Sequence, residues 1–352
     1  MKIEVQRQEL NEAIGIVKPA LGGMAPVFNM IRLTDGKIEA TNGDTWITTT
    51  IDAKIEEPGV VLIPGNRLAA ITKEIKADDI TIESDERAVT IRGGKSYFKL
   101  QTMPADEFPN QPEQKESKEI TINPDDLARV IREVSTAIST DESRFTLNGI
   151  NLDIKNSEVV GVTSDGRRLA ITQADIINQD EIEQSIIIPA SIIPAIKGII
   201  GSGGIALRIE PGKVEISNGV TSIISRLVEG RFPDYNQVIP SSVDKTITIN
   251  RQALINGMKM ASIMTDDKSN SVKLAFGENL IVTAIDPEGE SREEIDLIKS
   301  DGELEIAFNP WYIIDALKSV DDKEVQIDLI DSDSPGVIKA GKLSYIIMPM
   351  KL

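Results

Sequence analysis

The sequence predicts an α+β protein built from a repeated unit of a strand, a helix and further antiparallel strands. Three stretches begin alike: KIEVQRQEL at 2–10, EITINPDDL at 119–127 and TITINRQAL at 246–254. Each opens with the alternating apolar residues of a half-buried strand and continues with apolar residues at helical spacing. A repeat of about 120 residues is too long for a solenoid and favours three similar domains.

The first helix of each repeat is predicted directly after the opening strand. Apolar residues recur there at i, i+4 and i+7, which places them on one helix face. They are Leu10, Ile14 and Val17, then Leu127, Ile131 and Val134, and finally Leu254, Met258 and Ala261. We therefore expect each helix to pack this face against a sheet.

A second strand and helix follow in each third, so each domain is expected to hold two copies of the unit. These stretches are 60–75, 185–200 and 304–320. Hairpin-like strands follow them at 79–100, 205–227 and 325–348, and turn-containing strands precede them at 40–51, 161–172 and 282–297. Asp44, Asp165 and Asp286 recur at corresponding places in those turns. Polar linkers then place the three domains at 1–117, 118–243 and 244–352.

Composition excludes several kinds of site. The chain has 352 residues and a formal charge of −18 at pH 7, with no Cys and no His. It therefore forms no disulfide or thiolate site, and it lacks the commonest catalytic base. An enzyme would have to use carboxylates, Lys or Tyr. The acidic balance also means that contact with DNA needs a local basic surface.

No part of the sequence indicates a membrane partner. No run approaches the roughly 20 apolar residues of a membrane span, and MKIEVQRQEL at the N-terminus lacks the apolar core of a signal peptide. We expect a cytoplasmic protein. A phosphate loop at GSGG, residues 201–204, is disfavoured because no Lys-Ser/Thr follows. The three aspartates lie in separate domains and are not expected to form a metal site, so no cofactor or metal is predicted.

Several motifs resemble one family. VTSDGRRLA at 162–170, LVEGRFPDYNQVIP at 227–240, TLNGI at 146–150 and the terminal YIIMPMKL are similar to segments of the bacterial DNA polymerase III beta sliding clamp. The resemblance covers the whole chain and keeps the order of the motifs. It implies a non-catalytic processivity factor for DNA replication, in which three clamp domains place antiparallel sheets outside and helices inside.

The resemblance also implies a homodimeric ring around duplex DNA that an ATP-driven loader opens. Helices pack about 8–10 Å apart, so about six in a circle leave a hole of about 10 Å and about twelve leave one of about 28 Å. Duplex DNA is roughly 20 Å across and passes only the larger hole. A dimer whose helices line the hole is therefore required to encircle DNA.

The predicted helices carry more basic than acidic residues although the chain is acidic overall. Phosphate contacts position a protein without reading sequence, which suits sliding on double-stranded DNA. The residues expected to face DNA are Arg7, Arg67, Lys73, Lys76, Arg129, Arg132, Lys197, Arg251 and Lys259. Relatives often have a basic residue at the position of Met24 and a polar DNA contact at that of Asp141, so contact with DNA is expected to be weaker here.

The apolar C-terminus is expected to form a pocket for partner proteins. In the resembling family this segment receives a short motif that carries Gln and bulky apolar residues, through which DNA polymerase, clamp loader and repair proteins bind. The pocket residues that the resemblance implies are Leu147, Ser164, Gly166, Arg167, Arg168, Leu169, Pro233, Gln237, Val238, Ile346, Met348, Pro349, Met350 and Leu352. Arg168 is expected to fix polar groups of the peptide, and Met side chains adapt to different ligands. Gln237 stands where some relatives have Arg.

The dimer contact is expected between the first domain of one protomer and the third domain of the other. By resemblance, Phe98 and Leu100 meet Ile263 and Met264 of the partner. The basic residues Lys95, Lys99 and Arg67 face the acidic residues Glu288, Glu290, Glu293 and Glu294. Complementary charges of this kind steer association and make it sensitive to salt. A clamp-like factor of a phage, or a second copy that acts in repair, remains an alternative to the replicative clamp.

Overall fold

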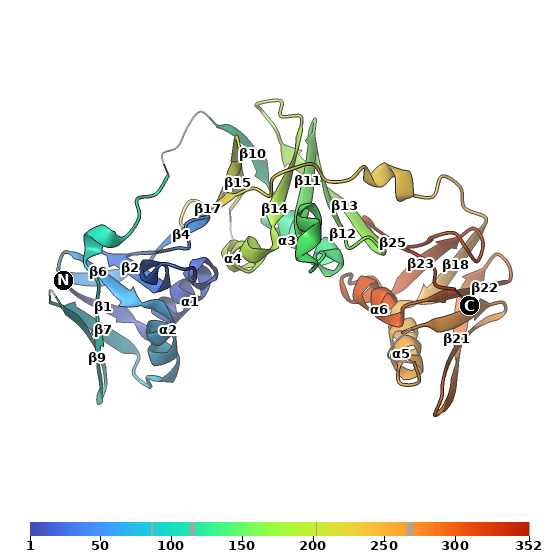
Figure 1. Cartoon of the computed structure of the whole chain (residues 1–352), viewed down its shortest axis with the longest axis horizontal. Coiled ribbons are helices and arrows are strands. Elements are labelled where there is room, and N and C mark those ends of the chain that lie inside the picture. The colour runs from blue at the N-terminus through green and yellow to red at the C-terminus, as the bar shows by residue number, and fades with distance from the viewer. Residues whose placement is uncertain (86, 113–116, 202, 266–269, 352) are drawn as a thin grey trace. The chain divides into compact units, whose positions relative to one another are not determined.

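The computed structural model describes residues 1–85, 87–112, 117–201, 203–265 and 270–351 (Figure 1). Helices alternate with antiparallel strands, so the predicted α+β class is confirmed. The residues form two compact units. Unit 1 comprises Met1–Leu127, Ile176–Ile182 and Ile188–Leu227, and unit 2 comprises Ala128–Asp175, Glu183–Ile187 and Val228–Leu352.

The middle third of the chain is divided between the units because its strands pair on two sides. Within unit 1, β17 (Ser222–Arg226) pairs with β4 (Thr45–Thr50). Within unit 2, β13 (Arg168–Ile177) pairs with β25 (Leu343–Ile347). The domain boundaries expected after residues 117 and 243 stay a prediction.

Unit 1 contains two antiparallel sheets. In order, the first has β5 (Ala53–Glu57), β1 (Lys2–Gln6), β7 (Asp79–Ser84), β8 (Ala88–Gly93) and β9 (Ser96–Gln101). The second has β10 (Lys118–Ile122), β15 (Ile205–Glu210), β16 (Lys213–Ser217), β17, β4, β3 (Lys37–Thr41), β2 (Met30–Thr34) and β6 (Val60–Pro64). Successive side chains of a strand point to opposite faces of the sheet, so β1 buries Ile3 and Val5 and leaves Glu4 half-buried.

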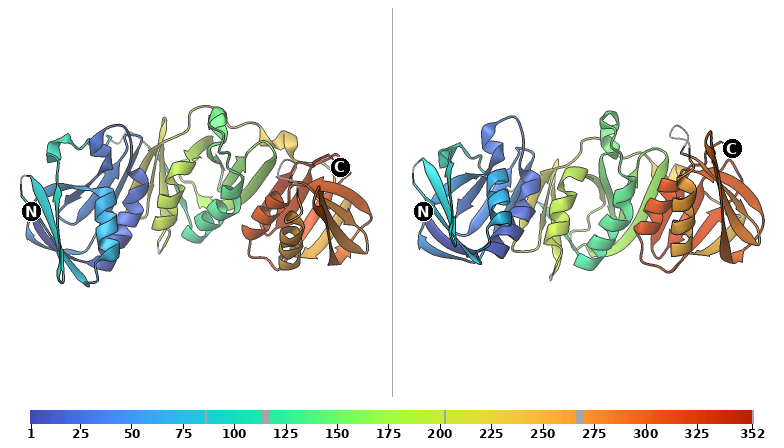
Figure 2. Two further views of the ribbon diagram at one scale, coloured as in Figure 1. Left: turned by 60° about the horizontal axis from the view of Figure 1, so that its bottom comes forward. Right: turned by 90° about the horizontal axis from the view of Figure 1, so that it is seen from below.

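The helices of unit 1 follow the predicted strands. They are α1 (Arg7–Val17), α2 (Gly65–Glu74) and α4 (Ile193–Ile199), with the 3₁₀ turns η1 (Lys18–Ala20), η2 (Pro26–Asn29), η3 (Ala105–Glu107) and η6 (Ala190–Ile192). The apolar stripe Leu10, Ile14 and Val17 of α1 is buried as the spacing predicts. Helices α1 and α2 lie side by side (Figures 1 and 2).

Unit 2 has one long antiparallel sheet and one short one that share a strand. The long sheet contains β14 (Gln184–Pro189), β11 (Gly149–Lys155), β12 (Glu158–Ser164), β13, β25, β24 (Gly336–Ala340), β23 (Glu324–Leu329), β18 (Lys245–Asn250) and β21 (Gly289–Ser300). The short sheet contains β21, β20 (Asn279–Asp286), β19 (Val272–Phe276) and β22 (Leu304–Phe308). The register of β21 shifts where it passes from one sheet to the other, between the partners of Thr248 and Ile249.

Asparagine side chains begin the helices of unit 2. These helices are α5 (Arg251–Ser262), α6 (Pro310–Lys318) and most of α3 (Pro124–Val134), with η4 (Ser135–Ala137), η5 (Glu142–Leu147) and η7 (Tyr235–Val238). The Asn250 side chain accepts a hydrogen bond from the Ala253 N–H at 2.9 Å, and that of Asn309 accepts one from Trp311 N–H at 2.9 Å. Each bond satisfies a backbone donor that the first helical turn leaves without a partner. Helices α5 and α6 lie side by side (Figure 2). No helix in the described ranges is long and apolar enough to cross a membrane.

Glu39 of β3 is a buried carboxylate in unit 1. It accepts hydrogen bonds from Arg32 at 2.7 Å and Lys37 at 3.0 Å, and its side chain is 6% exposed. Burial alone raises the pKa of this carboxyl, but the hydrogen bonds from Arg32 and Lys37 outweigh that effect and hold its pKa below the ordinary 4.5. The ion pairs of Glu39 with Arg32 and Lys37 therefore stabilise the fold when pH is above the unfolded-state pKa of the carboxyl. This contribution is lost as pH falls through the lower folded-state pKa.

We expect Glu39→Gln to lower the free energy of unfolding by about 1–2 kcal/mol at neutral pH, because two cations lose their charged partner. At an acid pH below the folded-state pKa the difference from the wild type is expected to shrink, since the native carboxyl also becomes neutral there. Urea unfolding at both pH values measures the effect. Glu74→Gln, at an exposed site on α2, is the control. An equal loss at both pH values would contradict the assignment.

Candidate functional site

The C-terminal segment is a core strand followed by a fixed tail. Strand β25 lies between β24 and β13, with Ile346 opposite Leu169 and Tyr345 opposite Ala170. Tyr345, Ile346 and Ile347 are each 2% exposed or less. The strand ends at Ile347, so residues 348–351 lie beyond it.

Backbone hydrogen bonds hold the tail against two neighbouring segments. The Met348 N–H donates to the Arg167 carbonyl at 2.9 Å, and the Met350 N–H donates to the Ala307 carbonyl at 2.8 Å. Met348 is nevertheless 43% exposed, which is unusual for a large apolar side chain held in a fixed position. The tail therefore presents an apolar side chain to solvent on a rigid support.

Beside this side chain is a hollow of about 80 Å³, which we call the tail pocket. Its lining residues are Ser164, Gly166, Arg167, Arg168, Leu169, Val238, Ile346 and Met348. Leu169 and Ile346 belong to a buried cluster with Val162 and Val337, and Phe232 and Tyr235 pack against that cluster. The floor of the tail pocket is thus apolar and rigid, which suits an apolar side chain of a partner.

A tight turn between β12 and β13 shapes one wall. The Asp165 carboxylate accepts hydrogen bonds from the N–H groups of Arg167 at 2.9 Å and Arg168 at 3.1 Å. Gly166 has φ +86°, a conformation that favours glycine, and its N–H donates to the Ser164 hydroxyl at 3.0 Å. The turn orients two consecutive arginines differently.

Arg168 is held within the wall of the tail pocket. Its guanidinium donates to Asp165 at 2.9 Å and to Asp315 of α6 at 2.7 Å, and it lies 4.4 Å from the ring centre of Tyr312. Its side chain is only 12% exposed. Burial lowers its pKa, but Tyr345 and the two carboxylates outweigh that, so the pKa is raised and the group stays charged. Its Nε and Nη1 atoms thus have protein partners, and the expectation that Arg168 fixes polar groups of a peptide stays a prediction.

Arg167 is the exposed arginine at the mouth. Its backbone groups bond to Asp165 and Met348, and its side chain makes no hydrogen bond or ion pair with any residue that the structure describes. The sequence did not distinguish the two arginines, because they are adjacent and chemically identical. It also missed Tyr312 and Asp315. The signal for Asp315 is a charged residue inside the buried run 313–317 of α6, where a carboxylate needs a cation.

A linker forms the opposite wall. We call residues 232–243 the strap. The Tyr235 hydroxyl donates to Asp153 of β11 at 3.1 Å, and burial together with this carboxylate raises the pKa of Tyr235 to about 12. Asp234 accepts hydrogen bonds from the side chain of Gln237 at 3.1 Å and the N–H of Asn236 at 3.2 Å. These bonds fix the turn η7, which directs Val238 into the tail pocket.

The structure brings most of the predicted pocket residues together and leaves others nearby. Leu147 is buried in η5, while Pro233 and Gln237 are exposed on the strap. The amide of Gln237 is already bonded to Asp234. Pro349 and Met350 are half-buried in the tail, and Leu352 lies outside the described residues. Their roles in binding stay predictions.

Three of the arginines expected to face DNA are bonded within unit 2. Arg129 donates to Thr172 at 2.9 Å and to the Gln173 carbonyl at 2.8 Å. Arg132 and Arg251 donate to carbonyls at the C-terminal end of α6, Ser319 at 2.9 Å and Leu317 at 3.0 Å. A cation there complements the helix dipole, so these residues have a structural use that helical spacing alone did not reveal.

The other basic residues expected to face DNA lie on the helices, apart from Lys76, which follows the end of α2 at Glu74. Arg67, Lys73, Lys76, Lys197 and Lys259 are exposed, and Arg7 is half-buried. Asp141 accepts hydrogen bonds from Ser143 and lies near Arg144, 3.6 Å away. Met24 is fully exposed between two 3₁₀ turns.

The residues expected at the dimer contact lie on β9 and β21, in the turn before β9 and just after α5. Phe98 is 37% exposed and Leu100 is half-buried on β9, which has β8 as its only partner among the described strands. Ile263 is 68% exposed, and the Met264 side chain comes within 3.0 Å of the position that a Cβ on Gly289 would take. Lys95, Glu290 and Glu294 are exposed and Glu293 is half-buried.

The turns that precede β4, β13 and β21 show that Asp44 is not the counterpart of Asp165 and Asp286. Asp165 and Asp286 each accept hydrogen bonds from the N–H groups two and three residues later. In the first repeat Asn42 makes these bonds, at 3.0 and 2.8 Å, so Asn42 and not Asp44 is the equivalent residue. Asp44 pairs with Arg226 instead, at 3.3 Å.

The two alternative sites gain no support from the geometry. The described parts of the chain contain no group of three acidic side chains that could hold a metal ion. The turn at 201–204 leads into β15 rather than into a helix, and Ser202 lies outside the described residues. A phosphate loop needs the N-terminus of a helix at that place.

Comparisons with known proteins agree over the full length. Three family models match in order: the N-terminal domain of the DNA polymerase III beta subunit at residues 1–112, its central domain at 121–234 and its C-terminal domain at 236–351. The beta sliding clamp of Escherichia coli strain K12 is 30% identical, with all of both chains covered. The DNA polymerase III beta subunit of Thermotoga maritima has a TM-score of 0.92 at 28% identity over 100% of this chain and 99% of that one. A sliding clamp of Pseudomonas aeruginosa bound to griselimycin has a TM-score of 0.91 at 27% identity, with both chains fully covered.

Proposed function

The chain belongs to the DNA polymerase III beta subunit family, and we propose that it works as a head-to-tail homodimeric ring around duplex DNA. As a beta sliding clamp it is the non-catalytic processivity factor of DNA polymerase III in DNA replication. We further propose three domains, at 1–117, 118–243 and 244–352, and action in the cytoplasm. The ranges matched by the three family models support the first of these.

The dimer proposal rests on a strand pairing that occurs twice within the chain. Strand β17 ends the series β10, β15, β16, β17 and pairs with β4. Strand β25 ends the corresponding series β18, β23, β24, β25 and pairs with β13. The third series, β1, β7, β8, β9, ends in β9, whose outer edge pairs with no strand that the structure describes. The third acceptor strand, β21, also lacks a neighbour on one side of residues 289–296 among the described strands.

The two internal pairings define a register for the third. Phe98, Ile223 and Tyr345 are equivalent because each lies opposite an isoleucine of the preceding strand. In the strands that these edges pair with, β4, β13 and β21, the equivalent residues are Trp46, Leu169 and Glu290. Each lies four positions after the Asn or Asp whose side chain accepts the backbone hydrogen bonds of the preceding turn. Trp46 pairs with Ile224 and Leu169 with Ile346, which are the residues after Ile223 and Tyr345. The same rule places Lys99 of one protomer opposite Glu290 of its partner.

The chemistry of the two edges supports this register. Lys99 and Glu290 are exposed and oppositely charged, and opposite charges on facing strands stabilise a sheet. Phe98 falls opposite Ser291, whose hydroxyl is 3.5 Å from the Ala261 carbonyl of α5, so the Phe98 ring comes beside the exposed Ile263 and the half-buried Met264. Pairing also covers two edges that are otherwise open to aggregation.

A ring binds DNA by enclosure, and this sets the experiment. The homodimer is loaded on a nicked circular plasmid, isolated by gel filtration, and then treated with a restriction enzyme that cuts once. A ring is expected to be retained on the circle at high salt and to slide off the linear product. Retention on the linear DNA, or release from the circle at high salt, would overturn enclosure, because contact with phosphates alone weakens steeply with salt.

Partner proteins are proposed to bind through the tail pocket. Its apolar floor and the exposed Met348 support an apolar anchor residue. The fixed turn at Asp165 holds Arg167 at the mouth, where its guanidinium makes no ion pair with a described residue. We propose that DNA polymerase, the clamp loader and repair proteins each insert a short motif of Gln and bulky apolar residues. One pocket shared by many partners makes their binding mutually exclusive.

Arg167→Glu is expected to change which peptides bind. For a peptide with an acidic residue beside its apolar anchors we expect binding about 3- to 10-fold weaker, since an exposed charge pair contributes up to about 1 kcal/mol and is replaced by repulsion. A neutral peptide is expected to bind equally well to both proteins. Fluorescence anisotropy at low salt measures both. Arg87→Glu, an exposed site in unit 1, is the control, and equal weakening of both peptides would count against a charge effect.

A further inference from the structure

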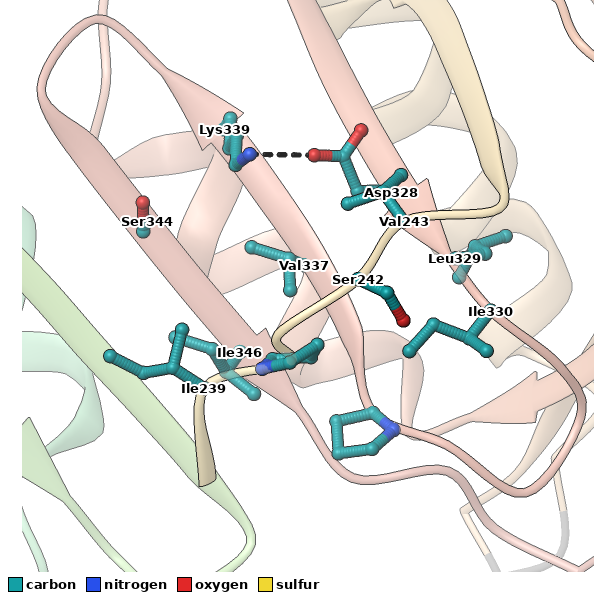
Figure 3. Close-up of a pocket in the computed structure, with 12 residues that line it drawn as sticks. Ile239, Ser242, Val243, Asp328, Leu329, Ile330, Val337, Lys339, Ser344 and Ile346 are labelled. Atoms are coloured by element: carbon teal, nitrogen blue, oxygen red, sulfur yellow. Dashed lines mark ion pairs between the residues drawn. The ribbon is translucent and has the colours of Figure 1, made fainter. Parts of the chain in front are cut away.

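A second hollow lies on the other side of the strap. It has a volume of about 70 Å³, close to that of the tail pocket, and space for one water takes only about 10–15 Å³. Figure 3 shows the strap passing over strands β23, β24 and β25, with Ser242 and Val243 above the hollow. Its lining residues are Ile239, Pro240, Ser242, Val243, Asp328, Leu329, Ile330, Pro335, Val337, Lys339, Ser344 and Ile346. We call it the strap hollow.

The strap hollow is apolar and its charges are paired. The ammonium of Lys339 lies 2.7 Å from the carboxylate of Asp328 (Figure 3), which also accepts hydrogen bonds from Thr246 at 3.0 Å and Gln326 at 2.7 Å. Asp328 is 2% exposed. The remaining walls are mostly aliphatic, and Ile239 and Val243 on the strap are 39% and 46% exposed. Such a space favours an uncharged apolar side chain.

The strap hollow and the tail pocket are neighbours that share one lining residue. Ile346 lines both, while the consecutive strap residues Val238 and Ile239 line one each. The strap therefore separates two spaces of similar size that open on the same face of the sheet. A segment that places one side chain beside Met348 therefore has the strap hollow next to it, across the consecutive residues Val238 and Ile239.

One end of the strap hollow carries negative charge. Ile330 and Pro335 line it, and between them the Asp331 carboxylate accepts hydrogen bonds from the N–H groups of Asp333 at 2.9 Å and Ser334 at 2.7 Å. The Ser334 side chain and these N–H groups lower the pKa of Asp331, so it stays ionised. No lysine or arginine in the described ranges forms an ion pair with Asp331, Asp333 or the neighbouring Asp244.

We propose that the strap hollow is a second subsite of the partner groove, which takes an apolar side chain that is next to a lysine or arginine in the partner segment. The proposal rests on the proposed function, since it uses the same partner. The apolar side chain replaces water over Val337 and Ile346. The basic residue meets the carboxylates at 331 and 333. The two subsites together select partners by a longer segment than the motif in the tail pocket.

The test uses synthetic peptides and the full-length protein. A short peptide with Gln and bulky apolar residues is compared with the same peptide extended at either end by a Gly-Gly spacer and Leu-Lys. One extended peptide is expected to bind about 10-fold tighter, a gain of about 1.4 kcal/mol. Replacing its added leucine by serine is expected to remove the gain. Equal affinity of the short and both extended peptides would overturn the proposal while leaving the proposed function intact.

Two variants test whether the gain in affinity comes from the strap hollow. Ser344→Phe places a ring in the strap hollow, and Val243→Asp places a carboxylate on its roof; neither residue lines the tail pocket. Both are expected to lower the affinity of the extended peptide to that of the short one and to leave the short peptide unaffected, which also shows that the variant is folded. A gain that persists in both variants would place the added leucine elsewhere. Failure of the short peptide to bind the wild type would instead contradict the tail pocket itself.

Discussion

Lys99→Glu is expected to raise the dissociation constant of the homodimer about 100-fold. In the proposed register Lys99 lies opposite Glu290, so the substitution replaces an attraction by a repulsion, a change of about 1.4 kcal/mol at one junction. A closed dimer has two identical junctions, and both separate on dissociation. The loss therefore doubles to about 2.8 kcal/mol, which corresponds to about 100-fold. Sedimentation equilibrium at low salt measures it.

A charge exchange tests the register itself. Glu290→Lys is expected to weaken the dimer as much as Lys99→Glu does, and the double variant is expected to recover to within about 10-fold of the wild type because the pair is restored with its charges reversed. Lys155→Glu, at the exposed end of β11, changes net charge equally and is the control. Without recovery in the double variant, these two residues do not face each other.

Met348→Asp is expected to weaken binding of a short apolar peptide more than 100-fold and to abolish processive synthesis by the polymerase. A carboxylate at the mouth of an apolar pocket must lose water when the peptide enters, and a central contact of this kind contributes about 2–4 kcal/mol or more. Peptide anisotropy and primer-extension length measure the two effects. The dimer is expected to stay intact, because residue 348 lies beyond strand β25 and far along the chain from β9 and β21.

The control for this variant is another exposed apolar residue. Val220 is 61% exposed in the turn between β16 and β17, so Val220→Asp makes the same change in charge without touching the tail pocket. It is expected to leave peptide binding and synthesis unchanged. Normal primer extension by Met348→Asp would show that the polymerase uses another surface.

The sequence predicted the elements well because their periodicity is local. The helical spacing of Leu10, Ile14 and Val17 predicts a buried stripe on one helix face, and α1 has it. The threefold repeat then indicated the architecture, since equivalent elements bury equivalent faces. The C-terminal strand and its exposed methionine were also predictable, although only the resemblance indicated that they form a pocket.

The sequence did not predict contacts between segments distant in the chain. Nothing local distinguishes Arg168, whose partner Asp315 is almost 150 positions away, from Arg167 beside it. The same holds for Arg132 and Arg251, whose carbonyl partners lie at the end of another helix. Equal spacing along the chain aligns Asp44 with Asp165, whereas the hydrogen bonds of the two turns show that Asn42 is the equivalent residue. The strap hollow depends on where a linker crosses a sheet, which no pattern encodes.

One strand position has acquired three different side chains within this chain. Trp46, Leu169 and Glu290 occupy it, facing Ile224, Ile346 and, as we propose, Lys99 of a second copy. At the first, the ion pair of Asp44 and Arg226 occupies the places of Arg167 and Met348. Of these three places, we propose that only the one with Arg167 and Met348 is left for partner proteins. In the proposed homodimer two tail pockets are then available, and we expect the partner enzymes to compete for them.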